Sequence, residues 1–572
     1  MAGTKNKSRK VQGKPASRQS PLSAVPFAMP SRPYLLLALA ILLAYIDIYP
    51  NTFIMDDIGL IVRNRFLTSW SYLPDLVTHL NYAGSRGNEG YYRPVPGVLH
   101  LIVYQLFGAS TVAFHTLNII CHAINAGLVY RLGRKLGFAE GATFVAALLW
   151  CLHPLHTEAV SYMNSTPELL WVTFTLLGLL ALVPECSWWN AAKAAACFLL
   201  ALGCKEASVV FSALAVLCMF MTSQDRFRLS TYIRTLPFWL MTVAYICIYT
   251  ALNPFKQCEG NLSAEYLHYC GHIFVRILTS LATLPVYAGL IFYPTGLHME
   301  RVFPFQTDAL SPLVLAGAAL AAGAALVVLL GRGRRWLPLG FGLTWFVIAL
   351  SPATGVLVPA DQLILEHWMY MPTVGLFFGL SQAAANGLAR LNSLPDKMKT
   401  EGAALLALVA AALLGFKTYS QNQIWLNPPS FYANVFAHGG YRRGLADLGY
   451  YYLRKHAFDD AAQSYEAALK DFDPNAVPEP ALHRALALAY LHVGLNANYT
   501  VTSDDINAAM PNVQNVPQAI EQLQKAVALD PDEYFSYGLL SALYKKQGDT
   551  KKSQLYYKKM QEAYQRKTVS AP

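Results

Sequence analysis

Charged residues are scarce in this chain. Of its 572 residues, 14% are Asp, Glu, Lys or Arg, whereas 54% are hydrophobic. A soluble globular protein carries about a quarter charged residues, so this composition excludes a single soluble domain. Many apolar runs approach the roughly 20 residues that a helix needs to cross the hydrocarbon core of a bilayer. The composition therefore predicts an all-α, polytopic membrane domain over residues 34–426, followed by a charge-rich soluble domain over 427–572.

Acidic residues are absent from the first 32 residues, which contain seven Lys or Arg. Short basic clusters stay on the cytoplasmic side of a membrane, so we interpret residues 1–33 as a cytoplasmic tail. The net charge of +10 is then a topology signal, and no nucleic-acid partner is expected. The apolar run 34–49 has no small-residue cleavage site after it, so we expect a first membrane helix and not a cleaved signal.

Cysteines are few, and seven of the nine lie in or beside apolar segments. There a thiol usually acts as a small buried hydrophobe. Cys258 and Cys270 instead share one polar loop. A disulfide between them is chemically allowed if that loop is extracytoplasmic, and two free thiols are the equal alternative.

The apolar segments predict about eleven membrane spans. The run 95–107 is too short to span, so we expect it to lie in the membrane interface. The run 273–292 must be a re-entrant or surface helix, because spanning would move a basic loop to the wrong side. The predicted spans are 34–49, 111–130, 141–155, 167–183, 190–203, 207–222, 231–252, 309–331, 337–351, 371–388 and 402–418.

This register places every strongly basic short loop on the inner side, as the distribution of Lys and Arg requires. These loops contain Arg131/Arg134/Lys135, Arg226/Arg228/Arg234, Arg332/Arg334/Arg335 and Arg390/Lys397/Lys399. An odd number of spans puts the C-terminal domain outside. The predicted outer loops are 50–110, 156–166, 204–206, 253–308 and 352–370.

The C-terminal domain has a spacing of small and aromatic residues similar to that of the tetratricopeptide repeat, which is about 34 residues long. A first unit covers 442–474. A second begins near Pro480, is interrupted by about 20 residues and resumes at Ala519, and a third starts at Tyr534. The pattern predicts an α-solenoid that holds a peptide or partner protein in its concave face, with a purely structural cap as the alternative.

Polar residues in the outer loops are the candidate functional groups. Asp56 and Asp57 follow the first helix, where adjacent carboxylates suit a general base or a cation ligand, with a solvated helix cap as the alternative. His153, His156 and Glu158 form a second group, which suits either metal ligation or interfacial capping.

Further polar residues occur where a bilayer makes them costly. Lys205-Glu206 open one predicted helix, and Glu366-His367 precede another. A stripe on one helical face marks either a functional pathway or hydrogen bonds between helices. It consists of His115, Asn118, His122 and Asn125.

Taken in order, these motifs resemble the TMTC-type protein O-mannosyltransferases of the GT-C superfamily. The motifs are the acidic pair, an Arg93-Pro94 before an interfacial helix, HPLHTEAV, CKEA, LSPATGVLVP, EHWMYMPTVG and the C-terminal repeats. The resemblance covers almost the whole chain. It implies about eleven membrane helices with two juxtamembrane helices, and transfer of a sugar from a polyprenyl-phosphate carrier to a Ser/Thr hydroxyl on the extracytoplasmic side.

The resemblance also implies roles for individual residues. Asp57 is expected to be the general base, with Asp56 orienting it or substituting for it. The expected donor-binding set comprises Arg93, His153, His156, Glu158, Lys205, Glu206, Arg301, Glu366 and His367, in which the cations bind phosphate and the carboxylates orient them or bind sugar hydroxyls. Where the family usually has arginine this chain has His367, whose charge depends on protonation.

The lipid-linked sugar would be a substrate, so no cofactor is expected, and a divalent metal stays compatible with the residues. Mannose follows from the resemblance, while another hexose fits the residues equally well. A non-catalytic scaffold that recruits extracytoplasmic proteins is the main alternative, and a transporter or lipid-sugar flippase is the third. We expect a bacterial inner-membrane protein with periplasmic repeats, or an endoplasmic-reticulum protein with lumenal repeats.

Overall fold

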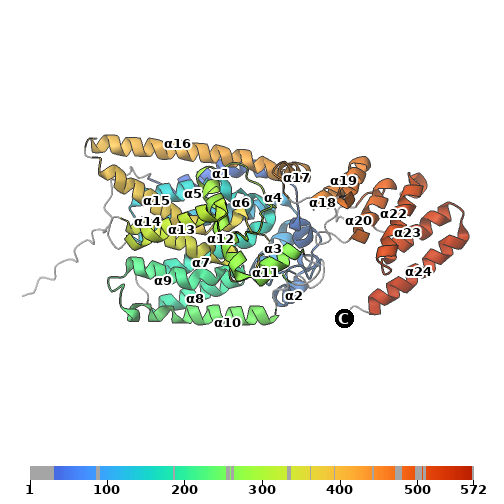
Figure 1. The fold of residues 1–572 in the computed structure, drawn as a ribbon, viewed down its shortest axis with the longest axis horizontal. Coiled ribbons are helices and arrows are strands. Elements are labelled where there is room, and N and C mark those ends of the chain that lie inside the picture. Colours follow the sequence, from blue (N-terminus) through green and yellow to red (C-terminus); the bar gives the residue numbers. More distant parts are fainter. Residues whose placement is uncertain are drawn as a thin grey trace, which may run out of the picture.

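The structure is a computed structural model. It describes residues 31–85, 90–183, 187–252, 258, 263–330, 336–360, 362–391, 393, 395–440, 444–470, 479–495, 506 and 510–569. These residues form helices joined by loops, as predicted for an all-α chain, and none of them is in a β-strand. Figure 1 shows a bundle of long helices with a row of shorter helices at one end.

Eleven helices of the bundle lie at the eleven segments predicted to span. They are α1 (Pro33–Tyr45), α4 (Thr111–Lys135), α5 (Glu140–Cys151), α7 (Thr166–Leu182), α8 (Trp188–Leu202), α9 (Phe211–Thr222), α10 (Leu236–Leu252), α13 (Pro312–Leu330), α14 (Leu337–Leu350), α15 (Pro372–Ala389) and α16 (Asp396–Asn422). Seven helical stretches among the described residues are long and apolar enough to cross a membrane, and six of them belong to this set. The chain is thus an integral membrane protein with multiple apolar helices.

Basic clusters lie near one end of the bundle. At one end, Lys135 Nζ donates to the carbonyls of Leu180 (3.2 Å) and Val183 (3.0 Å), so α4 and α7 finish side by side. The Ala139 N–H donates to Gln382 Oε1 (2.7 Å), which brings the late part of α15 to the same end. The clusters Arg131/Arg134/Lys135 and Arg390/Lys397/Lys399 therefore lie near the same end of the bundle, and the side of the membrane that this end faces stays a prediction. Arg332, Arg334 and Arg335 lie outside the described residues.

Helix α12 (Ile273–Phe292) is the seventh long apolar stretch, yet both of its halves contact one loop. Arg276 Nη1 donates to the Leu357 carbonyl (3.4 Å), and the Leu365 N–H donates to the Tyr287 hydroxyl (3.3 Å). Both partners belong to the loop between α14 and α15. Helix α12 therefore packs beside this loop, and its placement as a surface or re-entrant helix stays a prediction.

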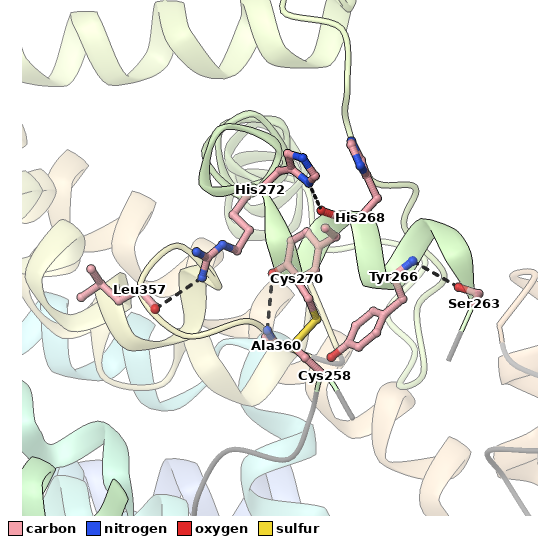
Figure 2. Close-up of a disulfide and its surroundings, with 10 residues drawn as sticks. Cys258, Ser263, Tyr266, His268, Cys270, His272, Leu357 and Ala360 are labelled. Atoms are coloured by element: carbon pink, nitrogen blue, oxygen red, sulfur yellow. Dashed lines mark hydrogen bonds between the residues drawn. A yellow bond between two sulfur atoms is a disulfide. The ribbon is translucent and has the colours of Figure 1, made fainter. Parts of the chain in front are cut away.

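A disulfide joins Cys258 to Cys270 beside the start of α12, with their Cα atoms 6.0 Å apart (Figure 2). Cys270 lies in α11 (Ala264–Gly271), whose Tyr269 hydroxyl accepts a hydrogen bond from the Ala360 N–H (3.4 Å). The bridge that the sequence left open is therefore formed, and it ties Cys258 to α11, while the Tyr269 contact holds α11 against the α14–α15 loop.

Two helix boundaries differ from the prediction for local reasons. Helix α5 ends at Cys151, before the predicted residue 155, because Pro154 follows and His153 Nδ1 accepts the Leu155 N–H (3.2 Å) to start a separate turn. Helix α9 is preceded by a 3₁₀ turn, Glu206–Val210, so the predicted segment 207–222 is not one continuous α-helix.

Short helices cover the end of the bundle opposite Lys135. They are α2 (Leu73–Thr78), α3 (Pro94–Phe107) and α6 (Thr157–Ser161). Helix α3 has the bounds expected of the interfacial segment 95–107. Its entry is fixed by the Val95 N–H, which donates to the carbonyl of Gly203 between α8 and α9 (3.1 Å).

Three helix pairs follow the linking helix α17 (Pro428–Ala437). They are α18 (Gly444–Arg454) with α19 (Phe458–Lys470), α20 (Glu479–Tyr490) with α22 (Val516–Leu529), and α23 (Tyr534–Lys546) with α24 (Thr550–Val569). These pairs lie at the positions predicted for the three repeat units. At the first crossing a Cβ on Gly449 would meet the Tyr465 ring at 2.6 Å, so the close approach requires glycine.

Helices α14 and α15 cross closely, so that a Cβ on Gly342 would lie 2.5 Å from the Gly375 carbonyl oxygen. Because backbone cannot yield as a flexible side chain can, Gly342→Ala should destabilise the protein by about 1–3 kcal/mol. The check is the thermal unfolding midpoint of the detergent-solubilised protein. Gly323→Ala in α13, which has no atom within 4 Å of the added Cβ, is the matched control. Equal midpoints for the two variants would contradict the close crossing.

Candidate active site

A cavity of about 700 Å³ lies where this end of the bundle meets the C-terminal helices. Its lining comes from the loop between α1 and α4, the start of α7, the turn before α9, the loops around 299 and 365, and the first C-terminal helices. The charged and amide residues of this lining are Asp56, Arg63, Arg93, Asn164, Glu168, Lys205, Glu206, Glu300, Gln362, His367 and Asp447.

The two adjacent aspartates point into different surroundings. Asp57 is fully buried, and its carboxylate accepts the Ile54 N–H (3.1 Å) and the Asn164 N–H (2.8 Å). Asp56 lines the cavity, and only its backbone is fastened, through an N–H that donates to the Tyr162 hydroxyl (3.1 Å). Asp57 therefore holds the loop, while Asp56 presents its carboxylate to the cavity.

The pKa of Asp57 and the backbone at Met55 both reflect the different surroundings of the two aspartates. Burial raises the pKa of Asp57 well above its usual range, the two donated N–H groups oppose that rise, and the charge of Asp56 adds to it. Met55, directly before the pair, has a φ of +49°, a left-handed conformation that a non-glycine residue rarely adopts. Such backbone persists where surrounding contacts enforce it, which is common at functional sites.

Arg93 is the first cation of the cavity, and Glu206 pairs with it at several points. Its Nη2 lies 2.8 Å from Glu206 Oε1, its Nε donates to Oε2 (3.2 Å), and the guanidinium lies 4.3 Å from the Tyr91 ring centre. Burial opposes ionisation of both partners, but each stabilises the other's charge. The pKa of Arg93 is therefore raised and that of Glu206 lowered.

Lys205 is the second cation, and it forms a buried ion pair with Glu168 in the first turn of α7. The other oxygen of Glu168 accepts the Trp171 indole N–H (2.8 Å). A lysine ammonium has three donors, so the pair leaves two of them for a ligand. The ion pair and the indole hydrogen bond both stabilise the charge of Glu168, which makes it a weaker base than a carboxylate without such partners.

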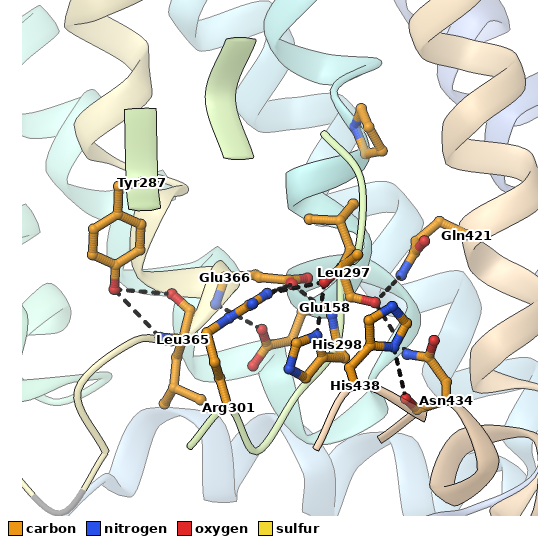
Figure 3. A network of polar contacts seen from close by, with 12 residues as sticks. Glu158, Tyr287, Leu297, His298, Arg301, Leu365, Glu366, Gln421, Asn434 and His438 are labelled. Carbon is orange, nitrogen blue, oxygen red and sulfur yellow. Dashed lines mark hydrogen bonds and ion pairs between the residues drawn. The ribbon is translucent and has the colours of Figure 1, made fainter. Parts of the chain in front are cut away.

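Behind the cavity wall, a second polar network surrounds Glu158 and Glu366 (Figure 3). The ring of His367 lines the cavity, while its Nδ1 is held by Glu158. The Glu366 carboxylate accepts the His298 N–H (2.7 Å) and lies 3.5 Å from Arg301 Nη2. Burial and the nearby Glu158 raise the pKa of Glu366. Glu158, Glu366 and Arg301 therefore lie behind the residues that line the cavity.

His153 and His156, both expected to bind donor, are outside the cavity. His153 Nε2 contacts the Ile291 carbonyl (2.9 Å), and His156 packs between the rings of Trp150 (5.2 Å) and Tyr370 (5.0 Å). Burial lowers the pKa of both imidazoles, so neither is a cation for a phosphate. The two histidines cap and pack the end of α5. Among the residues that the structure describes, no three His, Cys, Asp or Glu side chains come together as a metal site.

Three of the four residues in the polar stripe of α4 make hydrogen bonds to neighbouring segments. Asn118 Nδ2 donates to the Tyr162 carbonyl (3.0 Å), and His122 Nδ1 lies 2.6 Å from the Tyr370 hydroxyl. Asn125 Nδ2 donates to the Leu169 carbonyl (3.0 Å). Of the two alternatives for this stripe, these contacts favour packing over a pathway.

Several residues of the cavity were not in the predicted set. Tyr162 and Glu168 lie near the predicted HPLHTEAV motif. Glu168 could have been predicted as a site residue, because a carboxylate in an apolar helix is costly and marks a functional site. Glu300 lines the cavity in a left-handed conformation with a φ of +64°, and no sequence pattern predicted its position there. The C-terminal part of the lining was also missed, and it comprises Pro428, Tyr432, Asp447, Tyr450, Tyr451 and Ala481.

No family model matches the chain. Among characterised proteins, Protein O-mannosyl-transferase F38B6.6 of Caenorhabditis elegans is 23% identical over 467 residues, which are 77% of this chain and 62% of the relative. Protein O-mannosyl-transferase TMTC4 of Homo sapiens is 35% identical over 150 residues, covering 23% of this chain and 20% of the relative. The chain is thus distantly homologous to TMTC-type protein O-mannosyltransferases, and it spans less than two thirds of the length of these relatives.

Two solved structures show a weaker likeness. ArnT from Cupriavidus metallidurans bound to undecaprenyl phosphate has a TM-score of 0.36 at 14% identity, over 73% of this chain and 80% of that chain. The Archaeoglobus fulgidus oligosaccharyltransferase tethered with an acceptor peptide has a TM-score of 0.38 at 13% identity, over 76% of this chain and 59% of that chain. Scores this low do not identify the fold.

The raised pKa of Glu366 gives a prediction for the pH dependence of stability. At pH values between the pKa of an exposed glutamate and the higher pKa of Glu366, Glu366 is protonated in the folded state and ionised in the unfolded state. Stability should therefore fall as pH rises from 5 towards 8, and Glu366→Gln should flatten this dependence. Thermal unfolding midpoints at both pH values test it. Exposed Glu265→Gln in α11 is the control, and equal pH slopes in wild type and Glu366→Gln would refute it.

Proposed function

We propose that this protein is an inverting glycosyltransferase that moves a hexose from a polyprenyl-phosphate carrier to a Ser or Thr hydroxyl of an extracytoplasmic protein. The observation that carries the proposal is one cavity lined by Asp56, Arg93 and Lys205, a carboxylate with two cations. The distant homology to protein O-mannosyl-transferases supports it and favours mannose as the hexose.

Asp56 is the general base in this proposal, in place of the expected Asp57. A base needs an accessible lone pair, and among the described residues Asp56 forms no side-chain ion pair while its side chain faces the cavity. Asp57 has both oxygens occupied by backbone N–H groups, which suits a positioning residue. A carboxylate that removes the hydroxyl proton as the oxygen attacks contributes about 10²–10⁴ in rate.

Arg93, Lys205 and His367 bind the donor phosphate in this proposal. Glu206 occupies Nε and Nη2 of Arg93, which leaves Nη1 as a donor for a phosphate oxygen. Glu158 fixes Nδ1 of His367, so Nε2 is its free nitrogen. Donors that are already oriented stabilise the charge that develops on the leaving phosphate without reorganising during the reaction.

The proposed reaction is a single displacement. The acceptor oxygen bonds to the anomeric carbon from the face opposite the phosphate, and the bond between that carbon and the phosphate oxygen breaks. The hydroxyl proton moves to Asp56, and the polyprenyl phosphate leaves with the bonding electron pair. One displacement inverts the anomeric configuration.

The surroundings of the cavity suit a lipid-linked donor and a protein acceptor. A polyprenyl tail can stay in the hydrocarbon beside the bundle while its phosphate reaches the cavity at the bundle end. We propose that the three C-terminal helix pairs are tetratricopeptide repeats that hold the acceptor, which raises its concentration at the site. We further propose a bacterial inner membrane with this end periplasmic, or the lumenal side of the endoplasmic reticulum.

Asp56→Asn tests the assignment directly. The variant should transfer hexose about 10²–10⁴ times more slowly, because the amide cannot accept the proton, while donor binding stays close to wild type. The measurement is transfer from polyprenyl-phosphate mannose or glucose to a Ser/Thr peptide by purified protein. Asp75→Asn, in α2 of the same outer loop, should leave the rate unchanged. If wild type transfers no hexose from either donor yet still binds partner proteins, the non-catalytic scaffold is the correct function.

A further inference from the structure

The loop that carries Asp56 lies between two hydrophobic cores. Directly after the acidic pair, the chain forms one π-helical turn, Ile58–Val62. Ile58 and Val62 lie four residues apart in this turn, and each packs against two separate clusters. The first, in the bundle, consists of Phe53, Ile61, Val103, Phe114 and Met163.

The second cluster is the core of the C-terminal helix pairs, which includes Leu453, Tyr465 and Leu486. Ile58 and Val62 are thus shared by the bundle and the C-terminal domain. A π-turn of this kind inserts an extra residue into a helical turn and is frequent at functional sites. Here it lets both side chains contact both cores.

A second apolar contact fastens the residue before the acidic pair. Met55 packs against a cluster that includes Tyr432 of α17 and Trp425 at the end of α16. The Tyr432 hydroxyl in turn donates to Asp447 Oδ2 of α18 (2.7 Å). Asp56 is therefore flanked on both sides by residues that contact the C-terminal part of the chain.

The same part of the chain also closes the cavity. Asp447, Tyr450 and Tyr451 of α18 line the cavity, and so does Ala481 of α20. The cavity that holds Asp56, Arg93 and Lys205 is consequently incomplete without the first C-terminal helices. A domain that only tethered the acceptor at a distance would require neither this wall nor the contacts of Ile58 and Val62.

We propose that the C-terminal helical domain is part of the reaction centre, where Ile58 and Val62 are positioning residues that dock the Asp56 loop on its core, and Tyr451 forms the acceptor side of the cavity. This inference rests on the proposed glycosyl transfer. A tether changes only the local concentration of the acceptor, and so affects KM for long acceptors. A positioning element changes kcat, because displacing a catalytic group by about 1 Å can cost about 100-fold.

The first experiment uses the full-length double variant Ile58→Ala/Val62→Ala. It should lower kcat for a short Ser/Thr peptide by about 10- to 100-fold and leave KM for the lipid-linked donor unchanged, because the phosphate ligands lie on other elements. Ile58→Val/Val62→Ile keeps the apolar volume and should restore the rate. Val77→Ala, an exposed valine in α2 of the same outer loop, is the control. An unchanged kcat in the alanine variant would overturn the positioning role.

Hydrogen exchange over residues 53–63 gives a readout that does not depend on transfer. Loss of the Ile58 and Val62 contacts should raise exchange in this loop in the alanine double variant but not in the valine/isoleucine variant. If residues 53–63 exchange equally fast in the two double variants, Ile58 and Val62 do not dock this loop on the C-terminal core, even if activity falls. Absence of transfer by wild type with any donor would refute the proposed function, whereas full transfer by the alanine variant would refute this inference alone.

Tyr451→Ala tests the acceptor wall. Loss of an aromatic side chain from a binding surface should raise KM for a short acceptor peptide about tenfold, with donor KM unchanged. Tyr557→Ala in α24, an exposed tyrosine outside the cavity lining, should have no effect. If Tyr451→Ala alters only long acceptors, or none, the C-terminal domain holds the acceptor at a distance and does not line the reaction centre.

Discussion

The structure depends on the cost of placing charge at the end of an apolar helix bundle. A buried ion is tolerated only when a counter-ion and further hydrogen bonds replace its water, and the cavity meets this requirement with pairs that join distant segments. Arg93 in the first outer loop pairs with Glu206 before α9, and Lys205 pairs with Glu168 in α7. These contacts link α3, α7 and the turn before α9, so the same ion pairs hold the bundle end together and form part of the site.

Much of the fold follows from patterns that the sequence displays. Apolar length and the placement of Lys and Arg predicted the bundle helices, because the bilayer imposes both rules on each segment separately. The repeat spacing located the three C-terminal helix pairs for a similar reason, since each pair is a local unit. The prediction failed at helix ends such as Cys151, where a histidine cap and a proline act over a few residues.

The sequence predicted many of the residues that line the site but not the role of each one. Asp56, Arg93, Lys205, Glu206 and His367 line the cavity as expected. Adjacent carboxylates look equivalent in a sequence, and only the turn at Met55 determines which of them faces the cavity. His156 resembled a ligand, yet its ring is enclosed by Trp150 and Tyr370. The tyrosines of α18 lie almost 400 residues from Asp56, and no local pattern in the chain indicates that contact.

The pairing of charges also explains why the position of Asp56 depends on other parts of the chain. Glu168 and Glu206 are oriented by the cations they neutralise, and Asp57 by two backbone N–H groups. Asp56 differs from these carboxylates, because no ion pair among the described residues holds its side chain, which leaves its lone pairs accessible as a general base requires. Its position must come from its neighbours in the chain, Met55, Asp57 and Ile58. Two of these three pack against C-terminal helices, so the geometry of the base is set by both domains together.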